Sequence, residues 1–133
     1  MNMIRSITFL LLGMLAITTA CSTNAQSTFK NAPIAQLTKI KTEKKAIVID
    51  VRTPAEWQEG VIDGATLFID FKSSNFKQEI AKLDKSKTYV VYCRSGGRSA
   101  GASQMMVDSG FKNVINMEGG IMSWGGKLVK KPL

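Results

Sequence analysis

The residues most able to do chemistry form the short run CRSGGRS, from Cys93 to Ser99. The apolar stretch 88–92 precedes this run, and a segment of helical pattern follows it. A cysteine at the carboxyl end of a buried strand lies at the edge of an open α/β sheet where ligands bind. Loop glycines and the unpaired N–H groups of a helix start form a nest for negative charge, which lowers the pKa of a thiol. Cys93 is therefore predicted to be a nucleophile.

The loop after the cysteine is predicted to bind anionic sulfur. It comprises Arg94, Ser95, Gly96, Gly97, Arg98 and Ser99. Its amides and two arginines suit a cysteine persulfide, whose terminal sulfur is negative, and an arriving anion such as thiosulfate. An inert core cysteine is the alternative interpretation, but such a cysteine needs no arginines and glycines around it.

The sequence has no histidine and only two cysteines, which excludes several kinds of catalytic and metal site. Zinc sites need three or four nitrogen or thiolate ligands, which two distant cysteines cannot supply. Catalytic pairs that activate a cysteine or serine with imidazole are excluded as well. We therefore expect no metal, and we expect backbone amides to activate Cys93. No organic cofactor is expected either, because the cysteine itself would store the transferred group.

Strand and helix patterns alternate along the rest of the chain. Strands are predicted at 29–32, 46–52, 65–69, 88–92 and 113–117, and helices at 33–43, 53–59, 75–83 and 98–109. Thr53 and Pro54 are the predicted cap and first turn of the second helix, which Gly60 ends. A final segment, 120–128, follows the last strand. Strands separated by helices predict one α/β domain with a parallel sheet.

The first 20 residues have the layout of a secretory signal peptide. Arg5 precedes the apolar run Ile7–Ile17, which is too short to span a membrane and leads into small residues. We therefore divide the chain into a signal peptide (1–20), a flexible tether (21–28) and one folded domain (29–133). The protein is predicted to be exported to a bacterial periplasm.

Cys21 resembles the lipidated first residue of bacterial lipoproteins, although Thr18 stands where that motif usually has leucine. Lipidation of Cys21 would give the protein an N-terminal lipid anchor, the single membrane contact that we expect. Ordinary cleavage after Ala25 is the alternative. A disulfide between Cys21 and Cys93 is a further alternative in an oxidising compartment, and lipidation of Cys21 would exclude it.

A formal net charge of +8 makes the chain basic. Its lysines are dispersed along the sequence, without the interleaved aromatic residues that stack nucleic-acid bases. We interpret them as a solvated surface and expect no nucleic-acid partner. A basic field would still attract small anions.

Three ordered motifs stand out: CRSGGRS (93–99), DVRTPAEW (50–57) with GVIDGA (60–65), and NMEGGI (116–121) with Trp124. In that order they resemble the active-site loop, the upstream signature and the closing element of the rhodanese family. Val61 is a departure, because the family usually has histidine there. The resemblance extends over about 29–128. It implies a rhodanese-like α/β fold, with a central parallel sheet of about five strands flanked by helices on both faces.

The resemblance also implies a sulfurtransferase in which Cys93 carries sulfur as a persulfide. The donor would be thiosulfate or a related small anion, and the acceptor a thiol, or cyanide in the laboratory. Asp50 and Arg52 belong to the upstream signature, and we interpret them as a polar pair that orders the loop rather than contacts substrate. We expect the domain to be a monomer.

Two other functions remain open at the level of the sequence. Related phosphatases also place a cysteine and an arginine in a loop of amides, but their loop is one residue longer than the four residues between Cys93 and Arg98. A non-catalytic persulfide carrier or rhodanese-like binding module would keep the same loop. Hydrolysis of a phosphate ester would identify a phosphatase. Many turnovers per chain, rather than loading with a single sulfur atom, would distinguish an enzyme from a carrier.

Overall fold

The structure of the protein is a computed structural model that describes residues 28–133. The predicted signal peptide (1–20), nearly all of the predicted tether (21–28) and Cys21 lie outside the described residues. Within 28–133, none of the helices combines the length and the apolarity that crossing a membrane requires.

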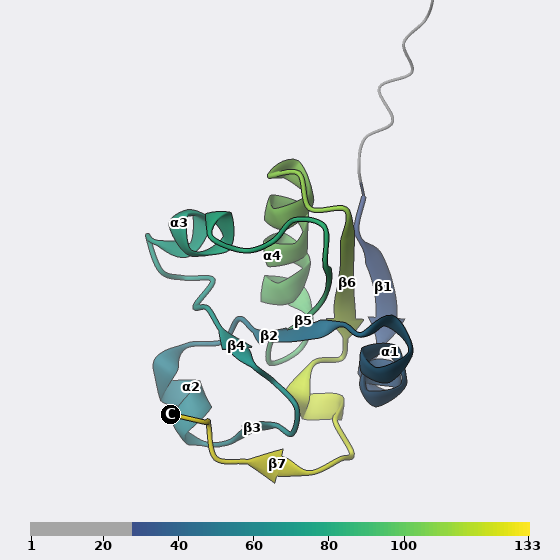
Figure 1. Ribbon diagram of the computed structural model, residues 1–133. Coiled ribbons are helices and arrows are strands. Elements are labelled where there is room, and N and C mark those ends of the chain that lie inside the picture. Colours follow the sequence, from purple (N-terminus) through teal and green to yellow (C-terminus); the bar gives the residue numbers. More distant parts are fainter. Residues whose placement is uncertain (1–27) are drawn as a thin grey trace, which may run out of the picture.

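Five strands form the central sheet (Figure 1). In spatial order they are β1 (Lys30–Pro33), β6 (Asn113–Glu118), β5 (Thr88–Tyr92), β2 (Ile47–Asp50) and β4 (Leu67–Phe68). Every pair of neighbours is parallel. The apolar strands β2 and β5 lie toward the centre, where both faces of a strand are buried. The parallel sheet of about five strands is therefore confirmed.

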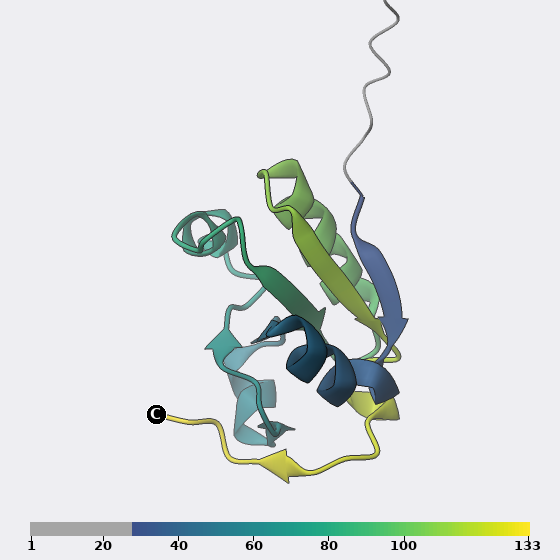
Figure 2. The same ribbon diagram turned by 45° about the vertical axis from the view of Figure 1, so that its right-hand side comes forward.

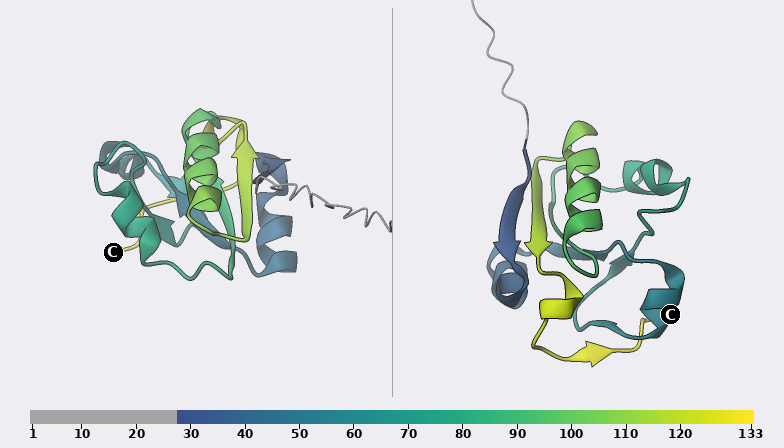
Figure 3. Two further views of the ribbon diagram at one scale, coloured as in Figure 1. Left: turned by 90° about the horizontal axis from the view of Figure 1, so that it is seen from above. Right: turned by 180° about the vertical axis from the view of Figure 1, so that it is seen from behind.

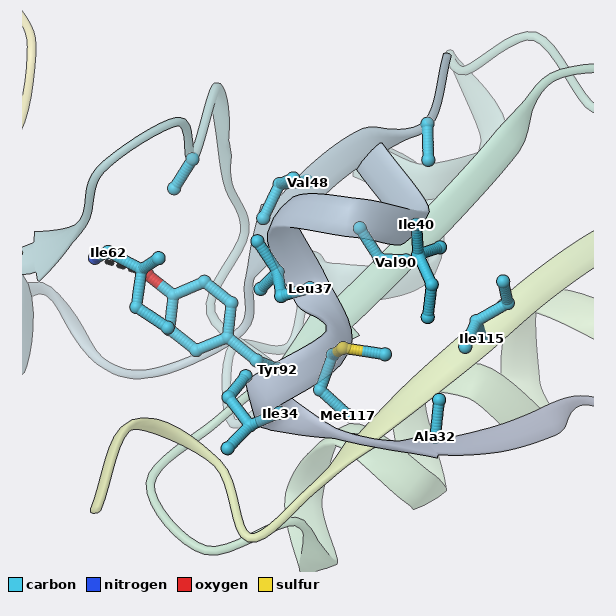
Figure 4. Packing of buried hydrophobic residues seen from close by; sticks show 12 residues of the cluster. Ala32, Ile34, Leu37, Ile40, Val48, Ile62, Val90, Tyr92, Ile115 and Met117 are labelled. Carbon is cyan, nitrogen blue, oxygen red and sulfur yellow. Dashed lines mark hydrogen bonds between the residues drawn. The ribbon is translucent and has the colours of Figure 1, made fainter. Parts of the chain in front are cut away.

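Helices cover both faces of this sheet. They are α1 (Leu37–Lys44), α2 (Pro54–Gln58), α3 (Phe76–Ala81) and α4 (Gly97–Asp108), with the 3-10 turns η1 (Ile34–Gln36) and η2 (Ile121–Ser123). Successive residues of a strand point to opposite faces. Val48 and Val90 accordingly pack under α1 (Figure 4), whereas Ile49 and Val91 pack under α3 and α4. The two views of Figure 3 show α1 and α4 on opposite sides of β6.

A second, two-stranded sheet pairs β3 (Val61–Ile62) with β7 (Leu128–Val129) in antiparallel fashion. The sequence did not predict it, because a two-residue strand is too short to show a periodic pattern. The final segment 120–128 forms η2 and then runs along the edge of the molecule to β7 (Figure 2). Because β7 pairs with β3, the last residues lie beside the turn that follows α2.

The predicted cap of α2 is confirmed. The Thr53 hydroxyl accepts a hydrogen bond from the Glu56 N–H, and the Glu56 carboxylate accepts one from the Thr53 N–H, which together form a capping box. Residues 28–133 contain both hydrophobic clusters and all seven strands that the structure describes. The residues of both clusters lie between Phe29 and Trp124.

Candidate active site

Cys93 follows β5 at the carboxyl edge of the sheet, where the chain turns into α4. The residue is only 1% exposed. The Gly96 N–H donates a hydrogen bond to Cys93 Sγ over 3.1 Å. Gly96 has φ of +109°, which glycine adopts without strain, and this turn directs its N–H at the sulfur. The structure thus places Cys93 between a central strand and a helix start, as the sequence predicts.

Ser99 lies in the first turn of α4 and is fully buried. Its hydroxyl oxygen is 3.4 Å from Cys93 Sγ and 3.1 Å from the Gly96 carbonyl oxygen, so its one proton can be donated to either acceptor. Burial disfavours the thiolate, but hydrogen bonds from the Ser99 hydroxyl and from the amides of Ser99, Gly96 and Ser95 outweigh it. The pKa of Cys93 is therefore lower than the ordinary value of a thiol.

The segment after β6 supports the cysteine loop through its carbonyl groups. The Ile121 N–H donates to the Cys93 carbonyl over 2.9 Å, and the Met122 N–H donates to the Arg94 carbonyl over 3.1 Å. Gly120 approaches so closely that an added Cβ would lie 2.5 Å from the Arg94 carbonyl oxygen. These bonds pair the carbonyl groups of Cys93 and Arg94 with η2. The amide N–H groups of the loop can then donate to Cys93 Sγ, as that of Gly96 does. The sequence showed Gly120 only as part of a family motif, and its packing role was missed.

Arg98, which the sequence predicts as part of the anion-binding loop, is paired with Glu56 in the structure. Its guanidinium donates hydrogen bonds of 2.8 and 2.7 Å to the two carboxylate oxygens of Glu56. Hydrogen bonding to Arg98 holds the pKa of Glu56 well below its ordinary value, and Glu56 in turn raises the pKa of Arg98. The pair ties α2 to the start of α4. Glu56 was missed as a site residue because it lies 42 positions from Arg98 in the sequence.

Arg94 is exposed, and it lines a hollow of about 460 Å³ beside the loop. The hollow is lined by Arg52, Thr53, Glu56, Glu59, Lys72, Arg94, Ile121 and Met122. Lys72 follows β4 and Met122 lies in η2, both outside the predicted loop, so no local pattern pointed to them. The Arg94 and Lys72 side chains bring two positive charges to this hollow, and Glu59 brings one carboxylate without a salt bridge among the described residues, so the unpaired charge is positive and suits an arriving anion.

Asp50 and Arg52 form a buried ion pair, with Arg52 Nη2 2.7 Å from Asp50 Oδ2. Arg52 also donates to the Gly60 carbonyl, and the Tyr92 hydroxyl donates to Asp50 Oδ2 over 2.6 Å. The Ile62 N–H donates to the Tyr92 hydroxyl (Figure 4). Burial and the Asp50 charge raise the pKa of Tyr92, which keeps this phenol protonated. The network joins β2, β5 and the turn after α2, which agrees with a structural role for the pair.

Neither Asp50 nor Arg52 hydrogen-bonds to Cys93 Sγ within the described residues. Within 28–133, no group of three or more histidine, cysteine, aspartate or glutamate side chains is arranged to hold a metal ion. The groups that the structure brings to the sulfur are the amides of Ser95, Gly96 and Ser99 and the Ser99 hydroxyl. The arrangement can stabilise negative charge on sulfur without an imidazole or a metal.

Comparison with known proteins identifies this architecture. The family model that describes the rhodanese-like domain matches residues 34–127 of the sequence. The chain belongs to the rhodanese-like domain family. The departure from the family pattern at Val61 falls on a fully buried position in β3 of this rhodanese-like domain.

Relatives of the rhodanese-like domain include proteins of similar and of greater length. The chain is 38% identical over 93 residues to YtwF of Bacillus subtilis, covering 70% of this chain and 86% of that protein. It is 30% identical over 98 residues to the thiosulfate sulfurtransferase GlpE of Shewanella oneidensis, covering 74% of this chain and 94% of GlpE. MoeZ of Mycobacterium tuberculosis is 39% identical over 85 residues, but the match spans only 21% of MoeZ and 64% of this chain.

Solved structures share the fold of the rhodanese-like domain. The rhodanese-like domain protein of Staphylococcus aureus superposes with a TM-score of 0.67 at 27% identity, covering 78% of this chain and all of that one. A rhodanese-related protein of Thermoplasma volcanium gives a TM-score of 0.66 at 30% identity, covering 77% of this chain and all of that one. The α/β fold with a central parallel sheet is thus that of the rhodanese-like family.

Proposed function

We propose that the protein is a sulfurtransferase that moves sulfane sulfur from thiosulfate, or a related small anion, to a thiophilic acceptor through a persulfide on Cys93. Membership of the rhodanese-like family, with sulfurtransferases among the relatives, supports sulfur transfer in general. The observation that carries the finer proposal is the Gly96 N–H bond to Cys93 Sγ, reinforced by Ser99 at the start of α4.

The first step is a displacement at sulfur. The Cys93 thiolate attacks the outer sulfur of thiosulfate, a new S–S bond forms, and the S–S bond of thiosulfate breaks. Its electron pair leaves with sulfite, and Cys93 is left as a persulfide with one negative charge on the terminal sulfur. Amides of the cysteine loop, directed at the sulfur, stabilise this charge without reorganisation. Arg94 and Lys72 in the adjoining hollow lower the repulsion that a dianionic donor meets on approach.

The second step returns the enzyme to its starting state. A nucleophilic acceptor attacks the terminal sulfur, the persulfide bond breaks, and the electron pair returns to Cys93 as thiolate. Cyanide gives thiocyanate in this step, and a thiol gives a new persulfide. The low pKa of Cys93 assists both steps, because the thiolate is nucleophile in the first and leaving group in the second.

Turnover with thiosulfate and cyanide tests this proposal. Residues 22–133 should form many equivalents of thiocyanate, and Cys93→Ser should form none while it keeps the wild-type unfolding transition. A single equivalent per chain would instead identify a persulfide carrier. Hydrolysis of a generic phosphate ester, without thiocyanate formation, would assign the loop to phosphatase chemistry.

The N-terminal sequence supports export as a second part of the proposal, with Cys21 as a lipid anchor on a periplasmic membrane face. The full chain should fractionate with membranes in a bacterial host, and Cys21→Ala should release it. The mass of the mature protein separates the alternatives, because cleavage after Ala25 would leave an unmodified chain that begins at Gln26.

A further inference from the structure

Lysines that are dispersed in the sequence gather at one edge of the folded domain. Parallel strands begin at a common edge, and a lysine begins β1 or shortly precedes β2, β5 and β6. We name this group the lysine edge: Lys30, Lys44, Lys45, Lys85, Lys87 and Lys112. Figures 1 and 2 show β1 and β6 starting at the same end of the molecule. The sequence could not reveal this cluster, because it depends on the parallel pairing.

The lysine edge carries more positive charge than the carboxylates near it can balance. All six side chains are exposed, and within 28–133 none of them makes a salt bridge. Three carboxylates lie close by, Glu43 and Asp108 in the last turns of α1 and α4 and Asp84 before β5, so six ammonium groups face three carboxylates. Glu43 lies 3.9 Å from Lys39, the Asp84 carboxylate accepts from Ser86, and the Asp108 carboxylate accepts from Gln104. The edge therefore presents ammonium groups to solvent.

Two hollows at this edge are suited to phosphate groups. One, of about 320 Å³, includes Lys30, Lys44 and Lys112 in its lining, with polar groups of Thr28 and Asn113. The other, of about 440 Å³, adjoins it at Lys44 and Thr88 and is lined by Lys45, Ser86 and Lys87 as well. Ammonium groups with hydroxyl and amide donors between them match the oxygens of a phosphate.

The lysine edge is too far from the sulfur site to serve it. Lys87 precedes β5 and Cys93 follows β5, so the strand separates them by its length. At about 3.3 Å per residue this is roughly 16–20 Å, about twice the Debye length of ~8 Å at physiological ionic strength. Exposed charges at that separation are screened from each other. The cluster therefore needs an explanation other than the Cys93 chemistry.

We infer that the lysine edge binds the surface of an anionic phospholipid membrane. The described chain begins at this edge, because Thr28 lines the first hollow. In the export proposal above, Cys21 carries a lipid anchor, and seven residues of chain lead from Cys21 to Thr28. Fully extended, that span reaches at most about 25 Å. A lipid on Cys21 would thus hold the lysine edge, rather than the Cys93 edge, next to the headgroups, and in this respect the inference rests on the proposed export.

The chemistry of the edge favours lipid over nucleic acid. Proteins that hold single strands stack bases on aromatic side chains, and neither hollow is lined by an aromatic residue. Dispersed lysines near an anionic bilayer each contribute about fivefold in affinity. Docking in this direction leaves the Cys93 site, at the opposite edge of the sheet, open to solutes in the surrounding solution.

Flotation of residues 22–133 with lipid vesicles tests the inference without the N-terminal attachment. The wild-type domain should float with phosphatidylcholine–phosphatidylglycerol vesicles but not with pure phosphatidylcholine. The edge variant Lys44→Glu/Lys87→Glu/Lys112→Glu should lose at least roughly a hundredfold in affinity, from about fivefold per lysine. The control Lys72→Glu/Lys127→Glu/Lys130→Glu has the same net charge but is altered around the hollow beside Arg94 and around β7. It should lose much less.

Equal losses in the two variants would overturn the inference, because net charge alone would then explain binding. Tighter binding to a single-stranded oligonucleotide than to anionic vesicles would overturn it as well. Thiocyanate formation by the edge variant should equal that of the wild type, which shows that its fold is intact. Because this readout belongs to Cys93, failure of membrane binding and failure of sulfur transfer are distinguished.

Discussion

Replacing Gly120 with alanine should break the support of the Cys93 loop. An alanine Cβ would lie 2.5 Å from the Arg94 carbonyl carbon and oxygen and 2.6 Å from the Cys93 carbonyl oxygen. Favourable contacts between nonbonded heavy atoms are about 3.5–4.0 Å, so the two segments must separate by about 1 Å. The obstructing atoms are backbone, and they cannot rotate away as a flexible side chain would.

The cost follows from what this separation disrupts. The hydrogen bonds from Ile121 and Met122 to the loop carbonyls would be lost, at about 0.5–1.5 kcal/mol each. Gly120 also has φ of +56° and ψ of −161°, a conformation that costs another residue about 1–3 kcal/mol. The free energy of unfolding should therefore fall by about 2–6 kcal/mol. For a domain of this size, that lowers the Tm by at least about 8 °C.

Thermal unfolding of residues 22–133 measures this effect, and Gly125→Ala is the matched control. Gly125 lies in the same terminal segment, has no positive φ, and would meet no atom within 4 Å of an added Cβ. Below its Tm, the Gly120→Ala variant should also form thiocyanate more slowly, because the loop amides are displaced from the sulfur. A Tm for Gly120→Ala within a degree or so of that of Gly125→Ala would refute the reasoning.

Two further predictions concern ionisation. Ser99→Ala should raise the pKa of Cys93, because a hydrogen bond to the thiolate is lost. The pH midpoint of iodoacetamide alkylation should therefore move to higher pH. An unchanged midpoint would exclude a role for the hydroxyl. Glu56→Gln should lower stability at neutral pH, because the bond to Arg98 weakens. The pKa of Glu56 is depressed from 4.5, so the stabilisation is complete above that pH and declines as the pH falls toward the folded value. Denaturation curves of the two proteins should therefore converge in acid, and a constant difference down to low pH would contradict this assignment.

The sequence predicted the parallel sheet because its strands are long enough to show their pattern. Runs such as 46–52 and 88–92 are continuous and β-branched, and helical spacing separates them. The pair of β3 and β7 was missed because each strand has two residues and their pairing joins distant segments. Antiparallel contacts between such short, remote pieces leave no local signal.

The sequence also predicted Cys93 and the turn at Gly96, since glycines after a strand and before a helix are local features. It failed where a site residue depends on tertiary contact. Arg98 was predicted as part of the anion-binding loop, but the sequence does not reveal that Glu56 accepts both of its hydrogen bonds. The packing of Gly120 against the loop and the gathering of the lysine edge depend in the same way on the fold.

The intact mass of residues 22–133, before and after incubation with thiosulfate and again after cyanide, tests the central claim most directly. We predict a gain of about 32 Da, one sulfur atom, which cyanide removes and which the Cys93→Ser variant does not acquire. A wild-type domain that gains no mass, while Cys93 remains open to alkylation, would contradict a thiosulfate-derived persulfide at this site. A gain that survives in Cys93→Ser would place the sulfur on another group.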